Sequence, residues 1–137
     1  MRLHHHIAHQ SKDFQATDDR LTALVRSWAG WLDDDECRRL RLGLHELLVN
    51  IRDHAYHGST GPIALLFTAS AGLFRIDVTD AGATFEGPIA RALPEDLAEG
   101  GYGLPIVTAV FDEVVHVRLD GRNWWALEVH RKDGGAV

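Results

Sequence analysis

Two pairs of short β-prone runs, each pair joined by a tight turn, constrain most strongly what this chain can fold into. Ile63 to Ala69 and Leu73 to Thr79 are separated by three residues that end in glycine, which is typical of a hairpin. Val114 to Leu119 and Trp124 to His130 flank Asp120-Gly121 in the same way. Because hairpins join neighbouring strands without a crossover helix, a fold of repeated strand-helix-strand units is disfavoured.

Helical periodicity occurs in three other segments. Apolar residues recur at three- and four-residue steps from Phe14 to Leu32 and again from Leu40 to Ala55. The acidic run Asp33 to Glu36 favours the first turn of the second helix, since negative charge stabilises a helix N-terminus. We therefore expect this helix over about 35–57. A third, apolar helix is predicted over Pro105 to Phe111.

The N-terminal segment has the alternation of an edge strand, with Leu3, His5 and Ile7 on one face. The three adjacent histidines, His4 to His6, raise the question of metal binding. Neighbouring side chains in a strand point to opposite faces, so these three cannot converge on one ion unaided. A solvated strand or an expression remnant is the favoured interpretation.

The order of elements predicts one domain over residues 1–137. A strand, two helices and a hairpin are followed by a loop rich in Gly, Ala and Pro, a helix and a second hairpin. This pattern is typical of an α+β fold, a two-layer α/β sandwich with a mixed sheet and its helices packed on one face.

Composition excludes several classes of function. With 14 basic and 20 acidic residues, the formal charge of −6 disfavours direct binding to nucleic acid or to anionic membranes. The single cysteine cannot form an internal disulfide, and neither a secretion signal nor an apolar run of about 18 residues is evident. We expect a cytoplasmic protein whose partners are proteins and small ligands.

Three polar motifs carry the chemistry. Glu46, Asn50 and His54 lie at four-residue spacing on the second helix, so they share one edge of it. Taken alone, such a triplet is equally typical of a solvent-facing helix.

The other two motifs contain glycine. Asp80-Ala81-Gly82 follows directly on a strand, which places a carboxylate at the strand end and a glycine where a ligand can approach the backbone. By itself this is also an ordinary turn. Gly100-Gly101-Tyr102-Gly103-Leu104 precedes the third helix, where free N–H groups and the helix dipole favour a phosphate, although a flexible hinge has the same composition.

In combination and in this order, the three motifs resemble the N, G1 and G2 boxes of the GHKL ATPase superfamily. The segment from Glu46 to Tyr56 and the ending Phe111-Asp112-Glu113-Val114 resemble anti-sigma factor serine/threonine kinases of the RsbW and SpoIIAB type, which have a histidine-kinase-like ATPase domain. The likeness covers about residues 40–130. It implies the Bergerat fold, ATP and Mg²⁺ as cofactors, and a role in bacterial transcription regulation.

The resemblance also implies a role for each motif, and the chemistry of the residues agrees. Glu46 is the expected catalytic base and Asn50 the protein ligand of Mg²⁺, an ion that takes few protein ligands. The carboxylate of Asp80 would accept a hydrogen bond from the adenine amine, which selects against guanine, and Gly82 leaves room for the ring. The residues expected to bind the cofactor are Asn50, His54, Asp80, Gly82, Gly101, Tyr102, Gly103 and Leu104.

Two features depart from the family pattern. Thr84 stands where many members have a second G1 glycine, and its side chain would narrow the entrance. The only lysines are Lys12 and Lys132, so a basic contact to phosphate would come from an arginine such as Arg52 or Arg91.

Other nucleotide motifs are missing from the chain. No Gly-Lys followed by Ser or Thr occurs, which excludes a Walker-type P-loop, and the glycines near residue 100 lack the strand-helix-strand context of a Rossmann fingerprint. The leading expectation is an anti-sigma factor that uses ATP and Mg²⁺ to phosphorylate a serine or threonine of an anti-anti-sigma partner with a STAS domain. It would also bind a sigma factor, and a homodimer is possible in this class.

There are two alternatives to the kinase. In the first, the chain is a nucleotide-responsive module that sequesters a partner without transferring phosphate. A sensor-kinase catalytic domain is disfavoured because the length leaves no room for a helix pair that carries the phosphoacceptor.

Overall fold

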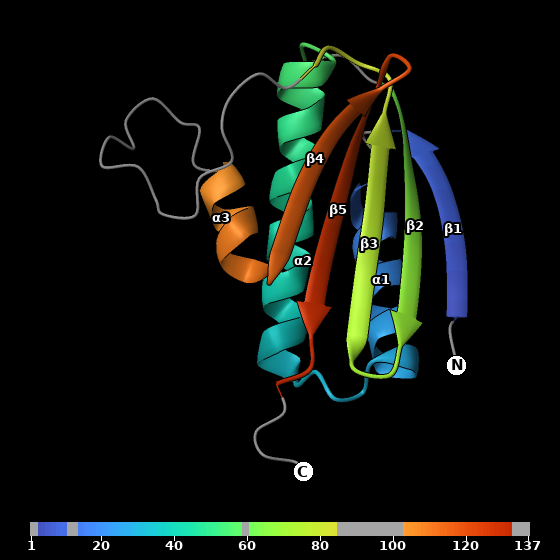
Figure 1. The fold of residues 1–137 in the computed structure, drawn as a ribbon, viewed down its shortest axis with the longest axis vertical. Helices are drawn as coiled ribbons and strands as arrows, with labels where there is room; N and C mark the ends of the chain where they lie inside the picture. The colour runs from blue at the N-terminus through green and yellow to red at the C-terminus, as the bar shows by residue number, and fades with distance from the viewer. Residues whose placement is uncertain (1–2, 11–13, 59–60, 85–102, 133–137) are drawn as a thin grey trace.

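The computed structural model describes residues 3–10, 14–58, 61–84 and 103–132, with the backbone alone for 3–10. Figure 1 shows the order of elements along the chain. The strands are β1 (Leu3–Gln10), β2 (Pro62–Ser70), β3 (Leu73–Asp80), β4 (Glu113–Leu119) and β5 (Arg122–His130). The helices are α1 (Phe14–Trp28), α2 (Asp34–Asn50), the π-helix η1 (Ile51–Ala55) and α3 (Gly103–Val110).

The described strands form one five-stranded sheet in the order β1-β2-β3-β5-β4. Each neighbouring pair is antiparallel, so the expectation of a mixed sheet is wrong in this respect. The reason lies in the connections. The crossover through α3 does make β4 run parallel to β3, but β5 lies between them and pairs with both. Between β1 and β2 the chain passes through two helices and reverses direction three times, which leaves those strands antiparallel as well.

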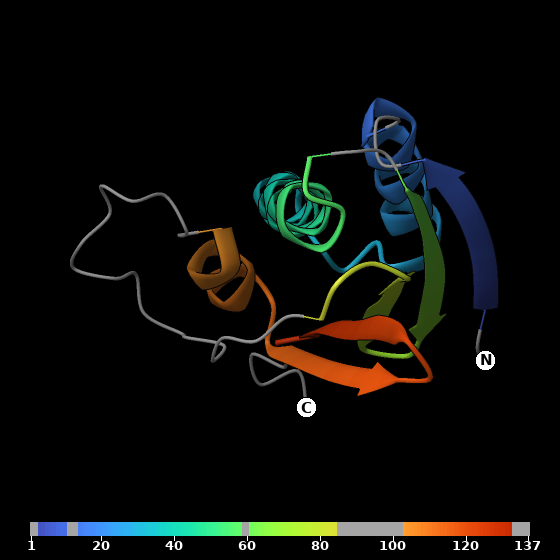
Figure 2. The same cartoon turned by 90° about the horizontal axis from the view of Figure 1, so that it is seen from above.

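The described helices all pack on one face of the sheet, as expected for the two-layer α+β sandwich, and α2 lies between α1 and α3 (Figure 2). The core between the layers follows the two sequence periodicities. Strands β2, β3 and β5 contribute alternate residues such as Phe67, Ile76 and Leu127, each 0% exposed. The stripe of α2 contributes Leu44 and Leu47 to the same core. Burial of these stripes is what holds the helices against the sheet.

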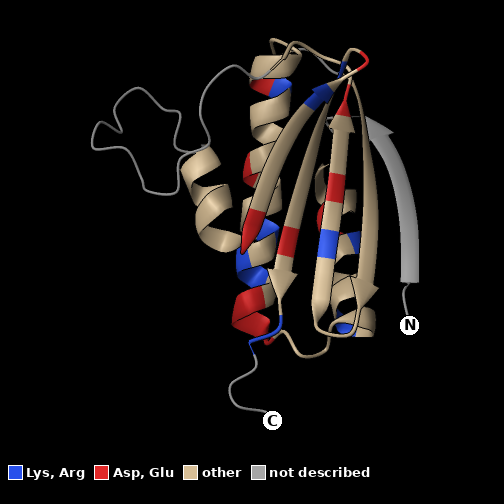
Figure 3. Ribbon diagram, viewed as in Figure 1, with Lys and Arg blue, Asp and Glu red and all other residues tan. Residues whose placement is uncertain are grey.

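The start of α2 is encoded locally. Asp33 and Glu36 form a capping box: Glu36 N–H donates to Asp33 Oδ1 at 2.7 Å, and Asp33 N–H donates to Glu36 Oε1 at 2.9 Å. The acidic first turn, followed by basic residues along the helix, is visible in Figure 3. The preceding helix α1 ends at Trp28 rather than near Leu32, because Ala29 to Leu32 turn towards this cap.

The end of α2 departs from α-helical geometry. Residues Ile51–Ala55 continue it as a π-helix, in which Tyr56 N–H donates to the carbonyl of Ile51 at 3.1 Å. The chain then leaves the helix through His57 and Gly58, which have φ values of 54° and 82°. Gly58 adopts this left-handed conformation without steric cost. The helix thus ends close to residue 57, as expected.

Helix α3 packs closely on α2 because α2 has a glycine at the contact. A Cβ on Gly43 would lie 2.9 Å from Phe111 and 3.1 Å from Val110, both at the end of α3. The backbone of α2 therefore approaches the side chains at the end of α3 closely, and both helices lie on the same face of the sheet.

Candidate nucleotide site

The carboxylate of Asp80 lies at the end of β3 and is 2% exposed. Its Oδ1 accepts hydrogen bonds from Gly82 N–H and from Asn123 Nδ2, both at 2.9 Å. Its Oδ2 is also buried and has no hydrogen-bond partner among the described residues. A buried carboxylate oxygen without a donor is costly, so this atom is suited to accept a hydrogen bond from a bound molecule.

The backbone of the Asp80-Ala81-Gly82 turn is held in place by the end of the helix. Ala83 N–H donates to the carbonyl of Ala55 at 2.8 Å. A Cβ on Gly82 would meet the same residue, at 2.6 Å from its carbonyl carbon and 2.7 Å from its Cβ. Gly82 is therefore required where η1 and the turn after β3 touch, a packing reason that differs from the expected clearance for a ligand ring.

Tyr56 connects three segments beneath this turn. Its hydroxyl donates to the carbonyl of Pro62 at 2.6 Å and accepts from Ala81 N–H at 2.9 Å. Burial raises the pKa of the Tyr56 hydroxyl, and the hydrogen bond from Ala81 opposes that shift. The hydroxyl thus keeps its proton and can donate and accept at once, which ties the helix end to β2 and to the turn after β3.

The polar edge of α2 reaches the same place. Asn50 is half-buried, and its side chain makes no capping bond to η1, so its amide is not consumed by the helix terminus. His54, within η1, is exposed. Such π-helical turns occur often at functional sites. Glu46 is half-buried one turn earlier.

A cavity of about 20 Å³ lies between the helix and the turn. It brings together three of the expected site residues, but Glu46 is absent from its described lining. A cavity of this size holds about one water, so a purine ring needs space beyond it. Thr84, the departure from the G1 pattern, contributes to the wall. The described lining residues are Asn50, Ile51, His54, Ala55, Asp80, Ala83, Thr84, Asn123 and Trp125.

Asn123 lines the same cavity, and sequence reasoning did not predict it there. It is 1% exposed, and besides Asp80 its Nδ2 donates to the carbonyl of Ala83 at 2.8 Å. A signal was present in the sequence, because Asn123 shares a face with Trp125 and Leu127 in the alternation of β5. A polar residue on the buried face of a strand calls for a polar partner.

The glycine-rich motif is only partly covered. Gly101, Tyr102 and Arg91 lie outside the described residues. Gly103 is the first residue of α3, in agreement with a glycine run that leads into a helix. Leu104 is 7% exposed and belongs to the hydrophobic core. Its side chain therefore packs among apolar residues.

Arg52, the other candidate for a phosphate contact, is directed towards α1. Its Nε donates to Asp53 at 3.0 Å, and its guanidinium carbon lies 5.6 Å from the centre of the Phe14 ring. Arg52 is not among the described residues that line the cavity at Asp80. These contacts assign Arg52 to the packing of α1 against the helix end.

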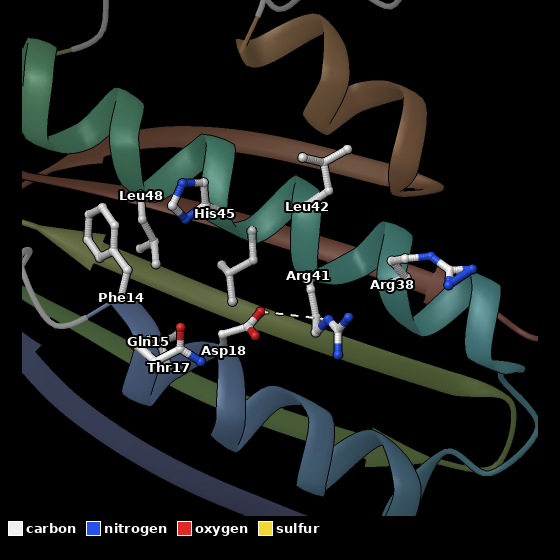
Figure 4. Close-up of a pocket in the computed structure, with 10 residues that line it drawn as sticks. Phe14, Gln15, Thr17, Asp18, Arg38, Arg41, Leu42, His45 and Leu48 are labelled. Atoms are coloured by element: carbon white, nitrogen blue, oxygen red, sulfur yellow. Dashed lines mark ion pairs between the residues drawn. The ribbon is translucent and has the colours of Figure 1, made fainter.

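A larger hollow of about 370 Å³ lies between α1 and α2 (Figure 4). Asp18 and Arg41 form an ion pair across it at 3.8 Å, and His45 meets the Phe14 ring edge-on at a centroid distance of 5.6 Å. None of the residues expected to bind nucleotide is among its described lining residues. The hollow is therefore separate from the site at Asp80.

Within the described residues, no group of three or more His, Cys, Asp or Glu side chains converges to hold a metal ion. The side chains of His4 to His6 are outside that description. None of the described helices is both long enough and apolar enough to span a bilayer.

These features define a class of protein. A two-layer α+β sandwich with a carboxylate at the end of β3 facing the polar edge of a helix agrees with the GHKL arrangement, and residues 14–127 match the histidine kinase-like ATPase domain family. The chain belongs to this family.

Among its relatives, the chain is similar to serine-protein kinases named RsbW. It is 33% identical over 89 residues to RsbW of Halalkalibacterium halodurans, which covers 58% of this chain and 54% of the relative. It is 29% identical over 96 residues to RsbW of Bacillus thuringiensis, covering 64% and 60%. The matches thus span little more than half the length of these relatives.

A solved structure supports the fold. The crystal structure of the RsbU and RsbW domains of Rv1364c from Mycobacterium tuberculosis superposes with a TM-score of 0.64 at 17% identity. The match covers 93% of this chain and 32% of that one. The resemblance to GHKL anti-sigma kinases is confirmed by these comparisons.

Proposed function

We propose that the chain is an anti-sigma regulatory factor of the cytoplasm that uses ATP and Mg²⁺ to phosphorylate a serine or threonine of a STAS-domain partner. The observation that carries the nucleotide site is the buried Oδ2 of Asp80, which has no partner among the described residues and belongs to a carboxylate that shares a cavity with Asn50. The similarity to proteins named serine-protein kinase supports the choice of reaction.

In this proposal Asp80 recognises the adenine end of the nucleotide and Asn50 binds the metal ion at the phosphate end. ATP with Mg²⁺ supplies the transferable phosphoryl group when bound. Asp80 Oδ2 accepts a hydrogen bond from the adenine amine, and the Asn50 amide oxygen serves as a hard ligand for the metal ion. The residues present fit the cofactor, because one buried acceptor lacks a donor among the described residues and Asn50 makes no capping bond to η1.

Glu46 is the proposed catalytic residue. Its carboxylate lies one helical turn before Asn50, so both are on the same edge of α2. There it orients the attacking hydroxyl of the partner and accepts its proton, a contribution of about 10²- to 10⁴-fold for a general base. Phosphoryl transfer needs little more than such positioning together with charge stabilisation.

The phosphates are assigned to the start of α3. Gly101 and Gly103 would bring backbone N–H groups against them, with Tyr102, Leu104 and His54 adjoining. Support comes from the position of Gly103 as the first residue of α3, because the first N–H groups of a helix have no partner within it.

A second candidate is a nucleotide-responsive module that sequesters its partner without phosphoryl transfer. The absence of Glu46 from the described lining of the cavity at Asp80 favours it. In this alternative the site binds ATP through Asp80 and Asn50, and Glu46 is a half-buried helix residue without a catalytic role.

We also propose that the chain forms a homodimer through the outer face of β4 and β5, called here the outer sheet face. One end has Glu113 opposite Glu128, but Glu128 is already paired with Arg75 of β3 at 2.9 Å, so Glu113 is the acidic group offered there. The other end has Arg122. A two-fold axis sets Glu113 of one copy against Arg122 of the other, which makes the face self-complementary. Its exposed apolar residues, between 41% and 57% exposed, are Val115, Val117, Leu119 and Trp124.

A transfer assay tests the function. The protein is incubated with γ-labelled ATP, Mg²⁺ and a STAS-domain protein from the same genome, and label on the partner is measured. Wild type transfers label, Glu46→Gln binds ATP but transfers at least about 10²-fold more slowly, and Asn50→Ala loses metal-dependent binding. Asp19→Asn on α1, whose side chain is exposed and bonded to Gln15, is the matched control and transfers normally.

Each result separates the candidates. Nucleotide binding by the wild type without transfer to any STAS protein refutes the kinase and leaves the sequestering module. If Glu46→Gln transfers label as fast as the wild type, Glu46 is not the base. A wild type that binds no ATP refutes both functions.

A further inference from the structure

Asn123 is the polar residue most closely joined to the proposed nucleotide site without being part of its motifs. It lies near the start of β5, where it pairs in register with Asp80 of β3. At 1% exposure its amide has no access to solvent. Each of its hydrogen-bonding groups therefore needs a partner inside the protein.

The contacts of Asn123 determine how its amide is oriented. Both protons of Nδ2 are used, one on Asp80 Oδ1 at 2.9 Å and one on the carbonyl of Ala83 at 2.8 Å. Because both of these atoms are acceptors, a flipped amide would set its own oxygen against them. The Asn123 oxygen instead lies 3.0 Å from His116 Nε2, which in this network donates its proton.

This network also determines which oxygen of Asp80 is available. Oδ1 already receives two donors, from Gly82 N–H and from Asn123 Nδ2. Oδ2 receives none from the described residues. If the Asn123 donor were removed, the carboxylate would lose the side-chain contact that distinguishes its two oxygens. Among the described residues, the bond from Gly82 would then be what orients it.

We propose that Asn123, held by His116, is a positioning residue that orients Asp80 so that Oδ2 accepts a hydrogen bond from an exocyclic amine, and that it thereby sets the preference for adenine over guanine. This inference rests on the proposed nucleotide site. Guanine presents a carbonyl where adenine presents the amine, so a correctly aimed acceptor oxygen rejects it, and a carboxylate free to rotate rejects it less.

The test measures a ratio of affinities rather than catalysis. The affinities of the whole chain for AMPPNP and for GMPPNP are determined by titration calorimetry with Mg²⁺, for the wild type and for Asn123→Ala. We expect the wild type to prefer the adenine nucleotide and the variant to lose at least about tenfold of that preference, the value of one hydrogen bond to a charged group. A merely structural role would weaken both nucleotides alike and leave the ratio unchanged.

Two further variants keep the test decisive if Asn123→Ala folds poorly. His116→Phe keeps a ring against Trp125, whose centroid lies 4.5 Å away, but removes the donor to Asn123, so the ratio falls in the same direction. Asp80→Asn removes the carboxylate itself. In the Asp80→Asn background, Asn123→Ala produces no further loss of preference, because it acts through Asp80.

The outcomes distinguish this inference from the proposed function. A wild type that binds neither nucleotide refutes both. A wild type that binds both equally, or an unchanged ratio in folded Asn123→Ala or His116→Phe, overturns the role of Asn123 and leaves nucleotide binding intact. A loss of preference that adds fully to that of Asp80→Asn also overturns it, since Asn123 then acts independently of Asp80.

Discussion

Replacing Gly82 by alanine tests whether the turn after β3 is held by the protein or shaped for a ligand. A new Cβ would lie 2.7 Å from the Cβ of Ala55 and nearer still to its carbonyl oxygen, and real Cβ atoms essentially never come within 3.0 Å. The backbone must separate by several tenths of an ångström, which strains the Ala83 N–H bond to Ala55 at 2.8 Å. Overpacking costs about 1–3 kcal/mol, and a weakened hydrogen bond adds about 1 kcal/mol.

We therefore expect Gly82→Ala to lower the free energy of unfolding by about 2–4 kcal/mol in the absence of nucleotide. This is a large share of the roughly 5–15 kcal/mol that stabilises a typical domain. Urea unfolding monitored by tryptophan fluorescence measures it, since the chain has four tryptophans, among them the fully buried Trp125.

Gly30→Ala is the matched control. Gly30 is exposed, and its Cβ would meet nothing closer than the carbonyl of Arg26 at 4.0 Å. The free energy of unfolding of Gly30→Ala should stay within about 1 kcal/mol of the wild-type value, or rise slightly because alanine restricts the unfolded chain. If Gly82→Ala without nucleotide is as stable as Gly30→Ala, the packing argument is wrong and the glycine serves only a ligand.

Three further predictions follow from single contacts. Asp33→Ala removes the acceptor of the Glu36 N–H bond and should cost about 1 kcal/mol in urea unfolding, whereas an unchanged midpoint would contradict the capping box. Burial raises the pKa of Asp112, but hydrogen bonds, first from His130 N–H, lower it overall, so its stabilisation is present above the unfolded pKa and is lost as pH falls through the folded value. Asp112→Asn should accordingly be less stable than the wild type at neutral pH and lose that deficit in acid, measured as unfolding free energy against pH. Val117→Asp, on the outer sheet face, should reduce the mass found by light scattering to that of a monomer, and an unchanged mass would refute the proposed dimer surface.

Much of the fold was accessible from local patterns. The runs from Ile63 and Leu73 predicted β2 and β3 to within one residue at each end, because alternation and turn residues act over a few positions. The same holds for the capped start of α2 at Asp33. Helix α1 was predicted about four residues too long, since Leu32 is buried through a turn and not through helical periodicity.

In the candidate site, too, local sequence patterns predicted some residues, whereas a residue with long-range contacts was not predicted. Spacing along a helix was sufficient to group Asn50 with His54, and the position of Asp80 at a strand end followed from its neighbours in sequence. Asn123 was not found, because its partners are distant in sequence and its signal was one polar residue in an alternating strand.

What the sequence by itself determined, then, is the set of elements, the family and the three motifs, all of which depend on residues within about one turn or one hairpin of each other. Only the tertiary structure decided that the sheet is antiparallel throughout, because the insertion of β5 between β3 and β4 is a long-range pairing that no local pattern encodes. It also decided that Gly82 is required by Ala55, and that one oxygen of Asp80 is occupied while the other has no described partner. These are properties of distances between segments far apart in the chain, and they exist only once packing has brought those segments together.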